Sequence, residues 1–97
     1  MRTISKSTLT RFSAGHADAA GALNEWYKQV DRAQWTCFAD LRNDFPSADS
    51  IANDRIVFNV KGNRYRIVAV IDFPMHGVLV RFVGTHAEYD KINAETL

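Results

Sequence analysis

The second half of the chain contains the segment Tyr65-Arg66-Ile67-Val68-Ala69-Val70-Ile71-Asp72-Phe73, whose centre holds five consecutive apolar residues. A strand with one face in water alternates apolar and polar side chains, whereas a strand buried on both faces has a continuous apolar run. The segment therefore predicts a central strand of a sheet that is covered on both faces.

A turn and a further strand flank this segment on each side. Before it, residues 55–60 show the two-residue alternation of a strand, and Lys61-Gly62-Asn63 offers the positive-φ positions of a tight hairpin. After it, Pro74-Met75-His76-Gly77 forms the next turn, and residues 78–85 return antiparallel. The three strands are predicted to form an antiparallel meander.

The first half of the chain has the spacing of helices instead. Ser5 is a favourable cap for a first helix, which Gly15 ends, and Asp18 begins a second helix. Thr36 caps a third, short helix, which Pro46 prevents from continuing. The second helix has an apolar face at the i, i+3, i+4, i+7 spacing, interpreted as core, formed by Leu23, Trp26, Tyr27 and Val30.

Helices followed by a meander are typical of an α+β domain in which the helices pack on one face of an antiparallel sheet. A chain of 97 residues is large enough for one core, so residues 1–97 are predicted to form a single domain. After the last strand, residues 87–92 are expected to form a short C-terminal helix of one or two turns.

The composition favours a globular protein of the cytoplasm. No apolar run approaches the roughly 20 residues of a membrane-spanning helix, and the start, Met1-Arg2-Thr3-Ile4-Ser5, lacks the pattern of a secretion signal. The single cysteine, Cys37, has no partner for a disulfide or a structural zinc site and is interpreted as a small packing residue. Neither a metal nor an organic cofactor is expected.

Any binding of nucleic acid by this chain depends on local rather than total charge. Twelve Lys and Arg residues against eleven Asp and Glu residues leave a net charge of only +1. Four cations nevertheless fall within twelve residues without an intervening acid, namely Arg55, Lys61, Arg64 and Arg66. Such a run is usually a solvated surface, and its position on a hairpin beside a polar corner is what favours binding.

Two segments resemble a known family when they occur together. Phe58-Asn59-Val60-Lys61-Gly62-Asn63-Arg64-Tyr65-Arg66 supplies amides and cations, and Arg81-Phe82-Val83-Gly84-Thr85-His86-Ala87-Glu88-Tyr89-Asp90-Lys91-Ile92 joins an apolar strand to a polar corner. Neither core packing nor a generic turn requires this set of polar residues. The pair is similar to the HigB family of RelE-like toxins, the ribosome-dependent mRNA interferases of type II toxin–antitoxin systems, and the similarity covers nearly the whole chain.

This resemblance implies a RelE-like fold and an endoribonuclease that cuts messenger RNA in the ribosomal decoding site. It implies as partners a HigA-like antitoxin with a helix-turn-helix domain, the ribosome and the message, with operator DNA reached only through the antitoxin and no role for a membrane. Because the net charge is only +1, weak activity on free RNA is expected. The family's polar site residues correspond here to Asn59, Lys61, Asn63, Arg66, Arg81, His86 and Tyr89.

RNA cleavage explains why these residue types suit such a site. The 2′-hydroxyl of RNA is the nucleophile, so the protein needs a proton acceptor, cations for the phosphate and a proton donor. His86 suits proton transfer because the pKa of imidazole lies near neutral pH, and Tyr89 is expected to stack on a base or to relay a proton. The candidate catalytic residues are His86, Tyr89, Arg81, Arg66 and Lys61, and the candidate RNA-binding residues are Asn59, Asn63, Arg64 and Arg55.

Several alternatives stay open at the sequence level. His86 alone would be interpreted as a surface histidine, and Asn63 fits a hairpin as well as it fits a binding site. Glu88 and Asp90 would repel phosphate, so they are expected to cap the last helix or to pair with Arg81 or Lys91. Which residue acts as base and which as acid is open. The scaffold could also act without catalysis on a partner protein such as a topoisomerase, as ParE-like relatives do, or be an inactive remnant.

Overall fold

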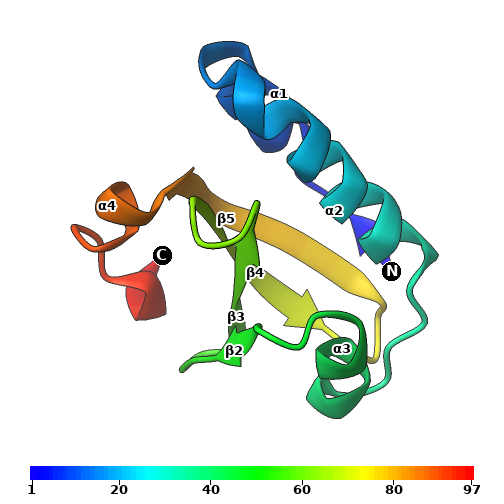
Figure 1. The fold of residues 1–97 in the computed structure, drawn as a ribbon. Coiled ribbons are helices and arrows are strands. Elements are labelled where there is room, and N and C mark those ends of the chain that lie inside the picture. Colours follow the sequence, from blue (N-terminus) through cyan, green and yellow to red (C-terminus); the bar gives the residue numbers. More distant parts are fainter.

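The computed structural model describes all of residues 1–97 and arranges helices against one face of a five-stranded sheet (Figure 1). The helical half consists of α1 (Lys6–Gly15), the 3₁₀ helix η1 (Ala17–Ala19), α2 (Ala20–Arg32) and α3 (Phe38–Asp44). The sheet consists of β1 (Arg2–Thr3), β2 (Asp49–Ser50), β3 (Arg55–Val60), β4 (Tyr65–Asp72) and β5 (Gly77–Thr85). The chain then forms α4 (His86–Tyr89) and the 3₁₀ helix η2 (Ala94–Thr96). None of these helices has the length and apolar character needed to cross a bilayer.

The strand order β1-β5-β4-β3-β2 puts β4 at the centre of the sheet, as its apolar run predicts. β3, β4 and β5 form the predicted antiparallel meander, and β1 joins β5 in parallel. The predicted α+β class, with helices on one face and a short C-terminal helix, is confirmed. Neither β1 nor β2 is visible in the sequence, because a strand of two residues has no periodicity to detect.

The main core lies between the sheet and helices α1 and α2. Three of the four residues of the predicted apolar face of α2 are buried there, namely Leu23, Trp26 and Val30. The fully buried ring of Phe58 meets Trp26 and Phe45 edge-on, with ring centroids 5.2 and 5.1 Å apart. Edge-to-face packing of this kind adds to the stabilisation from burial alone.

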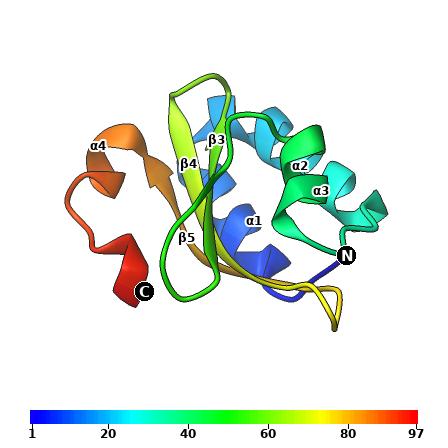
Figure 2. The ribbon, with the colours of Figure 1, turned by 90° about the horizontal axis from the view of Figure 1, so that it is seen from below.

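The C-terminal segment covers part of the opposite face of the sheet. In Figure 2, α4 and the C-terminus lie on one side of β4, and α1, α2 and α3 lie on the other. A smaller apolar cluster forms under this segment from Val57, Val68 and Ala94. Phe82 and Tyr89 pack against the cluster, whereas Asp72 at the end of β4 is exposed. The prediction that β4 is covered on both faces therefore holds for its centre but not for its end.

The hydroxyl of Ser5 does not cap α1, although Ser5 stands directly before the helix. It instead accepts a hydrogen bond from the amide of Val80 at 2.7 Å and donates to the carbonyl of the same residue at 3.3 Å. The sequence position of the cap was therefore predicted correctly, but its bonding was not. The contact joins the start of α1 to β5.

Asp18 and Thr36 also lie near helix starts without beginning a helix. Asp18 lies in η1, two residues before α2 begins, and its carboxylate binds the β3–β4 hairpin. Thr36 lies two residues before α3 begins, and its hydroxyl donates at 2.7 Å to the carboxylate of Asp40 within that helix. Cys37 directly precedes α3 and is exposed, so its interpretation as a packing residue is wrong.

Replacing Phe58 tests the position of the core. Phe58→Ala is expected to lower the free energy of unfolding by about 3–5 kcal/mol, because it leaves a cavity between Trp26 and Phe45. Urea unfolding followed by tryptophan fluorescence measures the change. Met75→Ala is the control, since Met75 is 78% exposed and should alter stability by less than about 0.5 kcal/mol. Similar losses in both variants would contradict this assignment of the core.

Candidate functional site

A capping box fixes α4 at the end of β5. The hydroxyl of Thr85 accepts from the amide of Glu88 at 3.1 Å, and the carboxylate of Glu88 accepts from the amide of Thr85 at 2.8 Å. The hydrogen bonds from the Thr85 amide and hydroxyl hold the pKa of Glu88 below its ordinary value. The amide of His86 donates to the carbonyl of Arg64 at 3.2 Å. The expectation that Glu88 caps the last helix is confirmed, and the corner is joined to the β3–β4 hairpin.

Three of the predicted site residues meet on the sheet face opposite the helices. The guanidinium of Arg66 lies over the ring of Tyr89, 4.6 Å from its centroid, in a cation–π contact. Its Nε donates at 3.1 Å to the amide oxygen of Asn59, which is its pairing partner on β3. Asn59 in turn donates to the carbonyl of Ser47 at 3.3 Å. Arg66 is thus oriented by two neutral groups, while its terminal nitrogens have no acceptor within the protein.

Gly84 gives this arrangement the space it needs. It pairs with Arg66 across β4 and β5, next to the corner that leads into α4. A Cβ at this position would lie 2.5 Å from Cζ of Phe82 and 3.2 Å from Oε1 of Glu88. A larger residue would therefore displace either the Phe82 ring or the carboxylate of the capping box.

His86 lies on the same short helix as Tyr89. The two residues are three positions apart on α4, so their side chains project from neighbouring positions on one side of the helix. Nδ1 of His86 lies 3.4 Å from Oδ2 of Asp90, and the His86 side chain is 44% exposed. The expected pairing of Asp90 with Arg81 or Lys91 is wrong, because the carboxylate of Asp90 lies beside the imidazole of His86 on the same turn of the chain. An imidazole, a phenol and a guanidinium are gathered at one end of the sheet.

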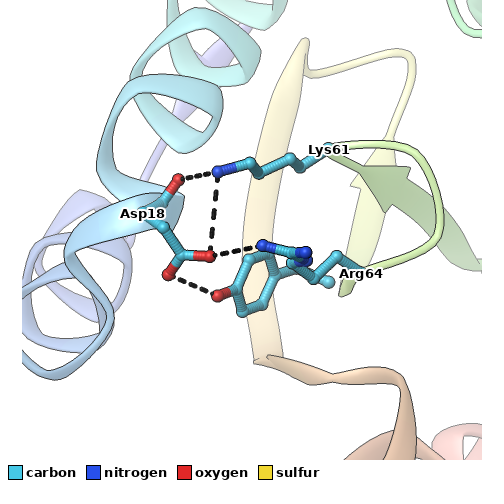
Figure 3. A network of polar contacts seen from close by, with 4 residues as sticks. Asp18, Lys61 and Arg64 are labelled. Atoms are coloured by element: carbon cyan, nitrogen blue, oxygen red, sulfur yellow. Dashed lines mark hydrogen bonds and ion pairs between the residues drawn. The ribbon is translucent and has the colours of Figure 1, made fainter.

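Lys61 and Arg64 belong to a different group, because their side chains reach the helical half of the molecule (Figure 3). Nζ of Lys61 lies 2.8 Å from the backbone oxygen of Asp18 and 3.7 Å from its Oδ2, and Arg64 lies 3.1 Å from the same Oδ2. The hydroxyl of Tyr65 donates to Oδ1 at 2.6 Å. This hydrogen bond from Tyr65, followed by Arg64 and Lys61, holds the pKa of Asp18 below its ordinary value.

The side chains of the other predicted residues form no hydrogen bond or ion pair with either group. Arg55 donates to the carbonyl of Asn53 at 3.0 Å, and Asn63 is exposed in the hairpin turn, where the positive φ angles fall on Lys61 and Gly62. Arg81 is exposed and occupies a β-bulge, because its two neighbours pair with consecutive residues of β4. A bulge changes the direction of a side chain at a sheet, and the sequence contains no pattern that reveals it.

Known proteins that are similar to this chain identify its family. A family model matches residues 19–92, a range that includes all candidate site residues. That family is described as HigB_toxin, RelE-like toxic component of a toxin-antitoxin system. The chain belongs to the HigB toxin family. The mRNA interferase HigB of Escherichia coli O6:H1 is 30% identical to this HigB-family chain over 94 residues, covering 95% of the chain and 91% of the relative. The mRNA interferase toxin HigB of Escherichia coli K12 is 41% identical over 56 residues, 56% of the chain and 54% of the relative.

The capping box yields a test of how α4 is fixed in this HigB-family toxin. Thr85→Ala is expected to lower the free energy of unfolding at pH 7 by about 1 kcal/mol, because the Glu88 amide loses its acceptor. Folding lowers the pKa of Glu88, so its contribution is present above the ordinary glutamate value of about 4.3 and is lost as pH falls through the folded-state pKa. Denaturant unfolding at several pH values should show this Glu88 contribution lost in acid by wild type and by Thr85→Ala, because both keep the Thr85 amide that donates to the carboxylate.

Thr10→Ala is the matched control for this measurement. The hydroxyl of Thr10 bonds only to the carbonyl of Lys6 within α1, so its loss should change stability by less than about 0.5 kcal/mol. A Thr85→Ala protein as stable as the Thr10→Ala protein would show that the capping box does not hold the corner.

Proposed function

We propose that this HigB-family toxin is an endoribonuclease that cleaves messenger RNA during translation on the ribosome. Membership of a family of toxic components, together with relatives named mRNA interferase HigB, supports this proposal. The observation that supports it best within the molecule is the Arg66 guanidinium on the Tyr89 ring, with His86 three residues away on the same helix. Residues 1–97 act as one RelE-like toxin domain, in the bacterial cytoplasm where ribosomes translate.

A toxin component of this kind implies a cognate antitoxin. We propose that the antitoxin is HigA-like and has a helix-turn-helix domain. The toxin then reaches operator DNA only as part of the complex, through the DNA-binding domain of its partner. The low net charge of +1 agrees with a toxin that has no DNA-binding surface of its own.

In the proposed reaction the 2′-hydroxyl of the message attacks the adjacent phosphorus. A base removes the 2′ proton, the new O2′–P bond forms, and the P–O5′ bond breaks as an acid protonates the departing oxygen. The products are a 2′,3′-cyclic phosphate and a 5′-hydroxyl. Since the nucleophile belongs to the substrate, the protein provides proton transfer, orientation and stabilisation of the charge that develops on the phosphate.

Arg66 suits the phosphate-stabilising role. Asn59 engages its Nε and Tyr89 covers one face of the guanidinium, which leaves both terminal amino groups free in a fixed plane. A guanidinium donates forked hydrogen bonds to two oxygens of one phosphate. Because its orientation is set before substrate arrives, no reorganisation is needed as charge develops. Arg81, exposed on the bulge, is the second cation proposed to act on the RNA.

His86 and Tyr89 are the groups proposed to transfer protons. The carboxylate of Asp90 beside Nδ1 favours a proton on that nitrogen and leaves Nε2 of His86 for the substrate. The ring of Tyr89 is covered by Arg66 and packs against the cluster under the C-terminal segment. A ring that is already engaged is poorly suited to stack on a base, so we assign the phenol hydroxyl to proton transfer.

Mapping of message ends tests this function. Added to a translating extract, the purified toxin is expected to produce fragments with 5′-hydroxyl ends and 2′,3′-cyclic or 3′-phosphate ends. The same RNA without ribosomes should be cleaved at least about tenfold more slowly, because only the ribosome fixes the message in a reactive geometry. Equal rates on free and ribosome-bound RNA would contradict the ribosome dependence. Growth arrest with intact message ends would instead identify a non-catalytic toxin.

Single substitutions test the assigned residues. His86→Ala is expected to reduce the single-turnover rate on ribosome-bound message by about 10²–10⁴-fold, as for loss of a general acid or base. Tyr89→Phe, which keeps the ring beneath Arg66, and Arg66→Ala and Arg81→Ala should each also reduce it. His76→Asn is the control, because His76 lies in a turn with φ of 54°, which asparagine tolerates. Wild-type rates in the His86, Tyr89 and Arg66 variants would exclude this site.

A further inference from the structure

The carboxylate of Asp18 lies where three donors of the β3–β4 hairpin converge (Figure 3). Its Oδ2 is 3.1 Å from Arg64 and 3.7 Å from Lys61, and its Oδ1 is 2.6 Å from the hydroxyl of Tyr65. The two oxygens of one anion thus meet two cations and a neutral donor. The same set of donors is suited to the oxygens of a phosphate.

Asp18 is not part of the hairpin that it neutralises. It lies in η1, at least 43 positions before the residues that it contacts. Among the four cations of residues 55–66, Lys61 and Arg64 have an acidic partner, and in both cases that partner is Asp18. The positive charge of the hairpin tip is therefore reduced by a residue from another part of the fold.

These ion pairs are accessible to solvent. The side chains of Asp18, Lys61 and Arg64 are 44%, 41% and 62% exposed. Ion pairs at this exposure contribute little to stability, because water solvates both charges when they separate. An anion of comparable charge that is held nearby can therefore take the place of the carboxylate without unfolding the hairpin.

We propose that Lys61 and Arg64 form an RNA phosphate site, which Asp18 occupies in the free toxin. Asp18 is then a specificity-determining residue that acts by competition. A phosphate of free RNA must displace the carboxylate, at a cost in affinity, whereas RNA held on the ribosome is present at a high effective concentration and displaces it readily. The inference rests on the proposed function and adds a reason, within this chain, for weak binding of free RNA.

Asp18→Asn removes the competing charge and keeps one oxygen, which accepts the hydrogen bond from Tyr65, while an amide NH2 replaces the oxygen that Arg64 contacts. Binding is measured by fluorescence anisotropy with a labelled single-stranded 2′-O-methyl RNA, which lacks the nucleophile and stays intact. The variant is expected to bind this RNA about tenfold more tightly than wild type in low salt. Release of two cations should also steepen the slope of log affinity against log salt by up to about 1.4.

Three variants separate competition from a general effect of charge or structure. Asp31→Asn makes the same change of charge at an exposed residue of α2 that has no ion pair, and should alter affinity less than about twofold. Adding Lys61→Gln and Arg64→Gln to the Asp18→Asn protein should abolish its gain. Tyr65→Phe disturbs the network without removing charge and should not tighten binding. Thermal unfolding confirms that each protein is folded.

A folded Asp18→Asn protein that binds RNA no more tightly than Asp31→Asn would overturn the inference. A gain that persists without Lys61 and Arg64 would overturn it as well. The proposed function is tested separately, by cleavage of ribosome-bound message with the wild-type chain. Tighter RNA binding by Asp18→Asn without any cleavage by wild type would support the phosphate site and reject the nuclease, whereas cleavage without tighter binding would reject the phosphate site alone.

Discussion

The alternation of side chains along β4 connects the core of this toxin to both of its polar groups. Successive residues of a strand point to opposite faces of a sheet. Tyr65 is buried on the helical side, where its hydroxyl meets Asp18, and Arg66 lies on the other side, where it covers Tyr89. Burial of Ile67 against the helices and of Val68 under the C-terminal segment fixes the register of the strand. A shift of β4 by one residue would move each side chain to the opposite face of the sheet. The contacts of Tyr65 with Asp18 and of Arg66 with Tyr89 would then both be lost.

The position of α4 depends on tertiary contacts, because a helix of four residues has no stability of its own. The capping box satisfies the amides of Thr85 and Glu88, the His86 amide donates to the hairpin, and Tyr89 packs on the smaller apolar cluster. Gly84 permits the close approach of Phe82 and Glu88 at the corner. The relation of His86 to Arg66 is therefore set by contacts with β4 and β5, which are central in the sheet and resist local opening better than an edge.

Local patterns in the sequence were sufficient to predict the central strand, the meander and the apolar face of α2, and to detect the two segments that resemble the family. Partners far apart in the chain were not visible to such patterns. The Ser5 hydroxyl binds β5 across 75 positions, and Asp18 meets Tyr65 across 47. Asp18 was assigned to a helix start because aspartate is common there. Neither its residue type nor its neighbours in the sequence indicate that it contacts the β3–β4 hairpin. The bulge at Arg81 was missed for the same reason, since it follows from pairing between strands.

The cations of this chain differ in how their charge is compensated. The difference suits the two roles proposed for them, charge stabilisation at the reacting phosphate by Arg66 and phosphate binding in competition with Asp18 by Lys61 and Arg64. Arg66 is held by an amide and an aromatic ring, neither of which is an anion, so its full charge remains available beside His86. Lys61 and Arg64 are held by a carboxylate, so much of their charge is cancelled until another anion replaces it. A net charge of +1 then leaves long-range attraction for RNA weak, while the charge of Arg66 is not cancelled by an acidic partner. This distribution of charge favours binding of RNA that is already held in position, and disfavours binding of RNA from free solution.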